Sequence, residues 1–223
     1  MRRIILFKIF VSLFLLSGYI LPYWFVIKES SEVRSRFNIN YIRFEGSIRY
    51  TDSENNNMNC GGEFTMKRSD GSFEVSINCE DGISRFRFKD AKLSSQTIKS
   101  RGSLFIKPIS YIAEYLDLVL PLPISSGRLK ERVCSLIKDC DNVGYKRLGG
   151  VINYRFASKE GGSYYMIEKE SYLPSALFLS EKNLSIESKK YFSFSTNIKF
   201  PSIIDIKTDG KSLTITVEEL TLE

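Results

Sequence analysis

The chain has 223 residues, with 32 Lys and Arg against 26 Asp and Glu, a net charge of +6 and no histidine. Without histidine the chain lacks Ser-His-Asp and Cys-His catalysis and the commonest ligand of zinc, copper and iron. Asp and Glu are scattered along alternating segments, where a solvated outer face is the ordinary arrangement. We therefore expect a non-enzymatic protein with no catalytic residues, metal or cofactor, and keep a carboxylate-based hydrolase only as a third alternative.

The first predicted element is an apolar segment, Ile9–Ile27, which contains no charged residue and follows three basic ones. About 20 apolar residues in a helix span the hydrocarbon core of a bilayer, and flanking basic residues stay on the cytoplasmic side. The sequence thus predicts that everything after Lys28 is exported. A cleaved signal peptide and a retained anchor both remain open. The retained anchor is favoured, because no A-x-A-like cleavage site is present and aromatic residues cluster at the outer end.

The distribution of charge and the chain length indicate how the chain is divided into segments and domains. Four basic residues lie in the first 28 positions, so the rest carries 28 basic and 26 acidic residues. The sequence pI of about 9.0 therefore mostly reports membrane topology, and no basic arm indicates nucleic-acid binding. We expect a signal sequence or uncleaved anchor at 1–28, a polar stalk or frayed first helix at 29–37, and one domain at 38–223.

The four cysteines fall into two local pairs, Cys60 with Cys79 and Cys134 with Cys140. In an oxidising compartment an even number of cysteines predicts disulfides, and four cysteines allow three connectivities. Folding the chain about the turn Ser69–Gly71 brings Cys60 nearly opposite Cys79, so we predict the two local pairings. A zinc site with four thiolates is the alternative, but neither pair has the close C-x2-C-type spacing that it needs.

Alternating apolar and polar residues predict antiparallel strands, and the period of two is clear from Ile42 to Tyr50. Turn signals at Gly161-Gly162 and Asp209-Gly210 mark tight hairpins. Consecutive antiparallel strands in such number tend to curl into a barrel or half-barrel. Further strands are expected at 58–66, 73–79 and 82–89, once or twice between 93 and 106, and at 151–158, 163–169, 175–181, 189–196, 202–207 and 212–222.

Two amphipathic helices are predicted between the two groups of strands. The first runs from Pro108, near the first helical position, to Pro121, which stops it. The second spans Ser126 to about Lys138, with Ser125 or Ser126 as its N-cap. The expected class is mainly β (α+β): an incomplete antiparallel barrel of about ten strands, with two helices covering its concave side, preceded by a transmembrane or signal helix.

Three segments in this order resemble the bacterial periplasmic lipoprotein-carrier family, which is LolA-like and has relatives in lipoprotein reception and envelope-stress sensing. Gly62–Arg68 (GEFTMKR) followed by Phe73 resembles the family's G-x-L-x-x-K-R-P-x-x-F segment. Met166–Pro174 (MIEKESYLP) resembles its W-I-D-K-x-x-G-L-P hairpin, and Phe200–Ile203 leading to Leu213–Val217 resembles its closing strands. The resemblance spans residues 38–223.

The resemblance implies a half-barrel that binds lipoprotein acyl chains between the sheet and a helical lid, with Arg68 holding the lid closed through hydrogen bonds to the helices. Burial of an acyl chain contributes ~0.8 kcal/mol per CH₂. The alternative is that the same residues form a filled core. The expected lining residues are apolar positions of the first strands and the first helix: Ile42, Phe44, Ile48, Phe64, Met66, Phe73, Val75, Ile77, Tyr111, Ile112, Tyr115, Leu116 and Val119.

The expected partners are lipoprotein acyl chains or lipid, the inner membrane through the N-terminal segment, and envelope transport proteins. The expected location is the periplasm, with the chain tethered to the inner membrane. The chain departs from the family at Ser69, where Pro is usual, at Tyr172, where the turn glycine is usual, and in its two cysteine pairs. A retained anchor would also differ from a diffusing carrier. A second hypothesis is therefore an envelope protein-interaction or stress-sensor module with the same fold and no lipid transport.

Overall fold

The computed structural model describes residues 21–36, 39–138, 140–158, 162–194 and 198–223. In these residues, twelve strands form one antiparallel sheet in the order β5-β4-β3-β2-β1-β12-β11-β10-β9-β8-β7-β6. The strands are β1 (Tyr41–Thr51), β2 (Asn57–Lys67), β3 (Ser72–Cys79), β4 (Gly82–Lys89), β5 (Lys92–Thr97), β6 (Val143–Leu148), β7 (Val151–Ala157), β8 (Tyr164–Glu168), β9 (Pro174–Leu179), β10 (Leu184–Ser193), β11 (Lys199–Thr208) and β12 (Lys211–Leu222).

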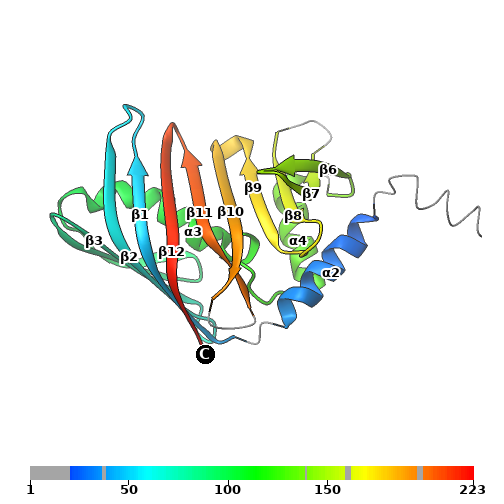
Figure 1. Cartoon of the computed structure of the whole chain (residues 1–223), viewed down its shortest axis with the longest axis horizontal. Helices are drawn as coiled ribbons and strands as arrows, with labels where there is room; N and C mark the ends of the chain where they lie inside the picture. The colour runs from blue at the N-terminus through cyan, green and yellow to red at the C-terminus, as the bar shows by residue number, and fades with distance from the viewer. Residues whose placement is uncertain (1–20, 37–38, 139, 159–161, 195–197) are drawn as a thin grey trace, which may run out of the picture.

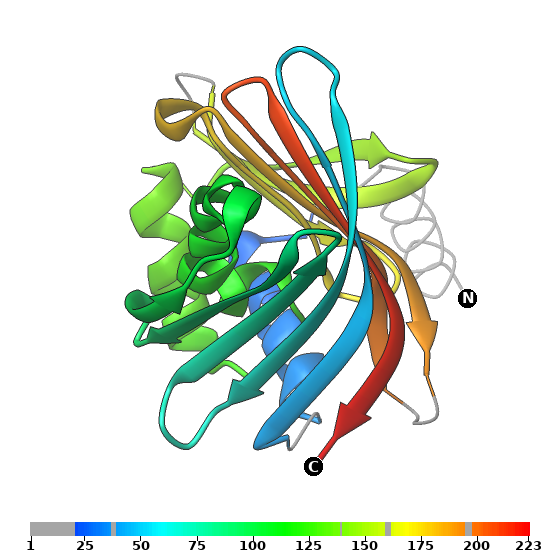
Figure 2. The same cartoon turned by 90° about the vertical axis from the view of Figure 1, so that its left-hand side faces the viewer.

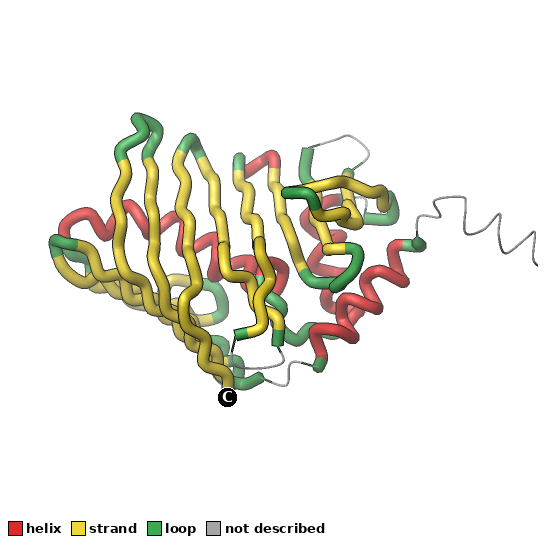
Figure 3. The backbone as a smooth tube through the Cα atoms, in the orientation of Figure 1, coloured by secondary structure: helices red, strands yellow, loops and turns green. Residues whose placement is uncertain are grey.

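The sheet is curved and open, with β5 and β6 at its two edges (Figure 1). The first strand, β1, lies in the middle of the sheet; from there the chain runs to one edge by hairpins and crosses to the other edge through helices. It then returns by hairpins until β12 pairs with β1. Figures 2 and 3 show the helices gathered on one side of the sheet, where they cover its concave face. They are α2 (Tyr23–Ser35), α3 (Ile106–Val119) and α4 (Ser126–Ile137), with short 3-10 turns η1 (Ser100–Phe105) and η2 (Ser180–Lys182).

The predicted class is therefore confirmed as mainly antiparallel β with an open sheet, and two element counts need correction. The structure has twelve strands where about ten were predicted. Strand β6 was missed because Tyr145, Lys146 and Arg147 are all exposed and leave no alternation to detect. The range 93–106 contains one strand, β5, and then η1. Of the predicted hairpin glycines, Gly210 takes a positive φ of 73° in the β11–β12 turn, while Gly161 lies outside the described residues.

The described part of the chain contains three α-helices where two were predicted. Most of the predicted apolar span Ile9–Ile27 lies outside the described residues, and within them no helix is long and apolar enough to cross a membrane. Residues 23–35 form α2, which packs against α4 (Figure 1). Its buried side chains, Val26, Ile27, Ser30, Ser31 and Arg34, recur at helical spacing. The boundaries of an anchor at 1–28 and a stalk at 29–37 stay predictions.

Both predicted disulfides are present. Cys60 and Cys79 join β2 to β3 with Cα atoms 4.5 Å apart, and the adjacent pairing of Gly61 with Asn78 places them directly opposite each other. Cys134 and Cys140 join the last turn of α4 to the loop that leads to β6. The first disulfide fixes strand register under the concave face, and the second fixes the exit of a covering helix.

Candidate functional site

The structure brings the thirteen predicted lining residues into one apolar layer between the concave face and α3. Ten of them are buried, while Met66, Tyr111 and Leu116 are partly buried against the same layer. The sheet side is a ladder of phenylalanine rings: Phe44 stacks on Phe64 with centroids 4.6 Å apart, and Phe64 continues to Phe73 at 6.5 Å. Two further rings of this ladder, Phe88 and Phe200, were not predicted.

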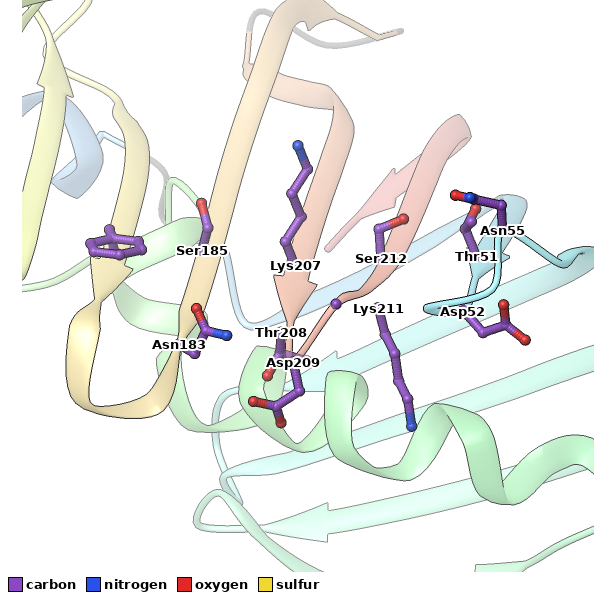
Figure 4. A pocket seen from close by; sticks show the side chains of 12 residues that line it. Thr51, Asp52, Asn55, Asn183, Ser185, Lys207, Thr208, Asp209, Lys211 and Ser212 are labelled. Carbon is purple, nitrogen blue, oxygen red and sulfur yellow. The ribbon is translucent and has the colours of Figure 1, made fainter.

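This apolar layer is filled in the conformation described. Phe64 and Ile77 in the sheet are 0% exposed, and Ile112 in α3 is 1% exposed. Two surface pockets, of about 440 and 420 Å³, lie at the rim, and none of the thirteen residues lines either one. Figure 4 shows the larger pocket at the turn ends of β10, β11 and β12, lined by polar side chains such as Lys207 and Lys211. Access to the layer therefore requires movement of the helices that cover it.

The connection between α3 and α4 contains buried backbone carbonyls that need hydrogen-bond donors. It reads Leu120-Pro121-Leu122-Pro123-Ile124, and its residues are buried or half-buried. Proline has no backbone N–H, and the last carbonyls of any helix lack partners within the helix. Within this connection, Leu120–Ile124, the Leu122 N–H donates to the Leu120 carbonyl at 2.8 Å. Because buried carbonyls need donors, the other carbonyls must obtain them from elsewhere in the fold. We call this connection the lid linker.

The main donor to the lid linker is Arg34 of α2, a residue outside the predicted site. Its side chain is 0% exposed. Nε donates to the Leu122 carbonyl at 2.8 Å, while Nη2 donates to the Leu120 carbonyl at 3.3 Å and to the Asp117 carbonyl in the last turn of α3. One turn earlier in α2, Ser31 Oγ donates to the Ile124 carbonyl at 2.7 Å. Helix α2 thus holds both ends of the lid linker.

Two strands supply further donors. Ser188 Oγ of β10 donates to the Val119 carbonyl at the end of α3, at 2.5 Å. Arg68, which follows β2, places Nη2 3.5 Å from the Pro123 carbonyl. Arg68 is exposed, and a hydrogen bond of that length is weak. The structure therefore places Arg68 beside the lid linker, and its role as a latch stays a prediction.

Arg34 is shielded from solvent and lies near Asp117, which forms an ion pair with Arg132. Burial lowers the pKa of Arg34, and nearby Tyr165 and Asp117 oppose this shift. Burial raises the pKa of Tyr165 to about 12, opposed by the positive charge of Arg34. The carboxylate of Asp117 accepts two hydrogen bonds from Arg132 of α4, each 3.1 Å long. The pair Asp117–Arg132 thus joins α3 to α4 directly.

Sequence reasoning missed Arg34 and Ser31 because residues 29–37 looked like a solvated stalk, and it missed Ser188 because the strand there was predicted to begin at residue 189. A signal was present in α2, since Val26, Ser30 and Arg34 are spaced four residues apart and share one helical face. The second signal was Pro121 with Pro123, because two missing donors in a buried connection require side-chain donors.

Comparisons with known proteins support the fold. No protein-family model matches the chain, and no curated protein matches it by sequence. A solved LolA superfamily protein from Nitrosomonas europaea superposes with a TM-score of 0.50 over 92% of this chain and 94% of its own, at 11% identity. A structure described as an outer membrane lipoprotein-sorting protein domain from Vibrio parahaemolyticus superposes with a TM-score of 0.46, over 88% of this chain and 92% of its own, at 12% identity.

The class that these observations define is an open antiparallel half-barrel covered by helices. The chain shares the fold of the solved LolA superfamily protein from Nitrosomonas europaea, as the three sequence segments predicted.

Proposed function

We propose that this domain is exported to the periplasm and binds the acyl chains of a lipoprotein or a lipid between its sheet and α3, in envelope lipid or lipoprotein trafficking. The observation that carries the proposal is the lid linker: an apolar layer is covered by helices whose connection is held by side-chain hydrogen bonds. Such bonds have net contributions of about 1 kcal/mol each, or about 1.5 to 3 kcal/mol where the donor is charged, because water can replace them. A cover fastened in this way can open without disrupting the sheet.

The proposed binding step replaces protein contacts by ligand contacts. When α3 moves, Ile112, Tyr115 and Val119 leave the layer, and the phenylalanine ladder becomes available. An acyl chain then buries its own CH₂ groups, which contributes ~0.8 kcal/mol each and offsets the lost packing of α3. The two disulfides and the fold support export to an oxidising compartment. We also propose that the N-terminal apolar segment directs this export and tethers the chain to the inner membrane.

Native mass spectrometry of the purified protein tests the proposal. We expect bound lipid or acylated protein on the wild-type chain and loss of that mass in Ile112→Lys, because a charge on the covering face opposes an apolar ligand. Ile83→Lys is the matched control, since Ile83 is 41% exposed in β4. If ligand persists in a folded Ile112→Lys variant, the assignment of α3 as the lid is wrong.

A second candidate is an envelope protein-interaction or stress-sensor module that uses the same fold without lipid transport. The filled apolar layer favours it, because Phe64, Ile77 and Ile112 leave no exposed surface there. The two candidates differ in one measurement. A ligand-free wild-type protein that also fails to take up a fluorescent fatty acid supports the sensor and contradicts the carrier.

A further inference from the structure

The hairpin of β6 and β7 projects from the sheet edge on the side opposite α3 and α4 (Figure 2). Its turn is Gly149-Gly150, with φ of +55° and +87°, and both glycines have open space where a side chain would be. Residues 145–152 form the end of this hairpin; β7 pairs with β8 from Asn153 onward, and the Lys169 N–H donates to the Ile152 carbonyl at 2.9 Å. We call these residues, YKRLGGVI, the hairpin tip.

The hairpin tip exposes apolar side chains on both of its faces. Leu148 pairs with Val151, and Arg147 pairs with Ile152. Because successive residues of a strand point to opposite faces, Val151 and Ile152 lie on different sides of the hairpin. They are 42% and 40% exposed. A flat protein partner would cover one face only, whereas a medium that surrounds the hairpin tip would cover both.

Basic residues flank these apolar side chains, and the neighbouring β8–β9 turn carries exposed Glu170 beside Lys169. Lys146 and Arg147 are exposed on opposite faces, and the hairpin tip contains no acidic residue. Lys169 adds a third cation, with Nζ 5.0 Å from the ring centroid of Tyr145. Tyr145 is itself 38% exposed, and tyrosine is enriched where apolar and aqueous layers meet. From its end inwards, the hairpin tip therefore presents apolar residues, then cations, then an aromatic ring.

We propose that the hairpin tip inserts into the interface of an anionic bilayer. An acyl region beneath anionic headgroups matches this sequence of layers, because it can surround Val151 and Ile152 while Lys146 and Arg147 meet the headgroups. The inference does not depend on acyl-chain binding in the apolar layer. It assigns a membrane contact to a part of the chain more than a hundred residues away from the N-terminal apolar segment in sequence.

A polarity-sensitive dye on a single introduced cysteine tests this contact in the full chain. Val151→Cys carries the dye at the hairpin tip, and Ile83→Cys, at an equally exposed site near the other sheet edge, is the matched control. Both proteins are reconstituted in vesicles of phosphatidylcholine with phosphatidylglycerol. We expect a blue shift and quenching by a lipid-borne quencher at position 151 only. Intact native disulfides and unchanged melting show that each labelled protein is folded.

A charge variant distinguishes the contribution of the basic residues from that of the apolar residues. Lys146→Gln with Arg147→Gln should weaken the contact about thirtyfold in phosphatidylglycerol vesicles, since each of the two cations contributes about 1 kcal/mol near an anionic surface. The same variant should change little in phosphatidylcholine alone. A dye at position 151 that reports water in anionic vesicles overturns the proposal. An equal blue shift at position 83 overturns it as well, because the contact would then not be specific to the hairpin tip.

Discussion

Arg34 connects α2, α3 and the lid linker. Its guanidinium is fully buried and bonds carbonyls of α3 and of the lid linker, although it comes from a helix almost ninety residues earlier. Arginine suits this position because its planar group carries five donors and stays protonated. The desolvation of that charge is offset by backbone carbonyls and by the nearby carboxylate of Asp117.

Replacing Arg34 should therefore loosen the lid linker. Arg34→Met keeps much of the side-chain volume and removes the donors, so we expect the free energy of unfolding to fall by about 3 kcal/mol. Chemical denaturation measures this change, and hydrogen exchange of peptides covering residues 116–125 should become faster. Arg36→Met, at an exposed position at the end of the same helix, is the control and should change stability by less than about 0.5 kcal/mol.

Arg68 should behave differently from Arg34, although the sequence pointed to it. Its contact with the Pro123 carbonyl is 3.5 Å long and exposed to solvent. We expect Arg68→Gln to lower the free energy of unfolding by less than about 1 kcal/mol in the same denaturation assay. A loss as large as that of Arg34→Met would show that Arg68 is the principal latch.

Buried tyrosines beside Arg34 predict sensitivity to alkali. Burial raises the pKa of Tyr165 to about 12. Between pH 10 and 12 the unfolded phenol has lost its proton while the folded one keeps it, so the free energy of unfolding falls as pH rises. By pH 11, Tyr165 should have lowered the free energy of unfolding by about 1.4 kcal/mol. Between pH 9 and 11, the free energy of unfolding should fall less in Tyr165→Phe than in the wild type, as measured by chemical denaturation at each pH. An equal fall in both proteins would show that Tyr165 is not the cause of the alkaline sensitivity.

At the scale of elements, the cover of the sheet is fastened at a few points. Helix α3 is interrupted at Tyr115, whose φ and ψ of −118° and 18° are not helical, and its end is bonded through Val119 to Ser188. Lys182 in η2 bonds Glu114 and the Tyr115 hydroxyl, each at 2.7 Å. The segment of α3 after Tyr115 is thus held to both the sheet and α2.

The disulfide that closes the longer loop should stabilise the fold more. Cys60 and Cys79 are 19 residues apart, whereas Cys134 and Cys140 are 6 apart. Loop entropy predicts a loss of about 3 kcal/mol for Cys60→Ala with Cys79→Ala, and about 2 kcal/mol for Cys134→Ala with Cys140→Ala. Denaturation of the two double variants measures both values. The reverse order would show that fixing the end of α4 matters more than loop entropy.

At the scale of the whole molecule, α2 belongs to the folded body. It buries Val26 and Ile27 and supplies the donors Ser31 and Arg34. A membrane span that included Val26 and Ile27 would withdraw both from this packing. We therefore propose that the folded domain starts at α2 and that any anchor ends before Tyr23, where Pro22 precedes the helix.

Truncation tests this boundary. A chain that starts at residue 38 lacks α2, so α4 loses its packing partner and the lid linker loses its main donors. We expect it to aggregate or to melt at least about 10 °C below a chain that starts at residue 21, which is the matched control. Equal melting temperatures would contradict a structural role for α2.

Much of the fold could be predicted because its signals are local. Alternation in β1 to β4, the prolines around α3 and the spacing of the cysteines each depend on neighbouring residues, and the structure confirms them. Strand β6 and helix α2 were not predicted as packed elements. One has no alternation of burial, and the other mixes charged and apolar residues on a segment that reads as solvated.

The sequence by itself determined the antiparallel class, the disulfide partners and the apolar character of the concave face, since strand period and cysteine spacing express local geometry. Only the tertiary structure decided what holds the lid linker. The carbonyls of residues 117–124 find donors on α2 and β10, and such pairings depend on how distant segments meet. The same is true of the filled interior, because side chains close a hollow only when the curvature of the sheet and the position of α3 are both set.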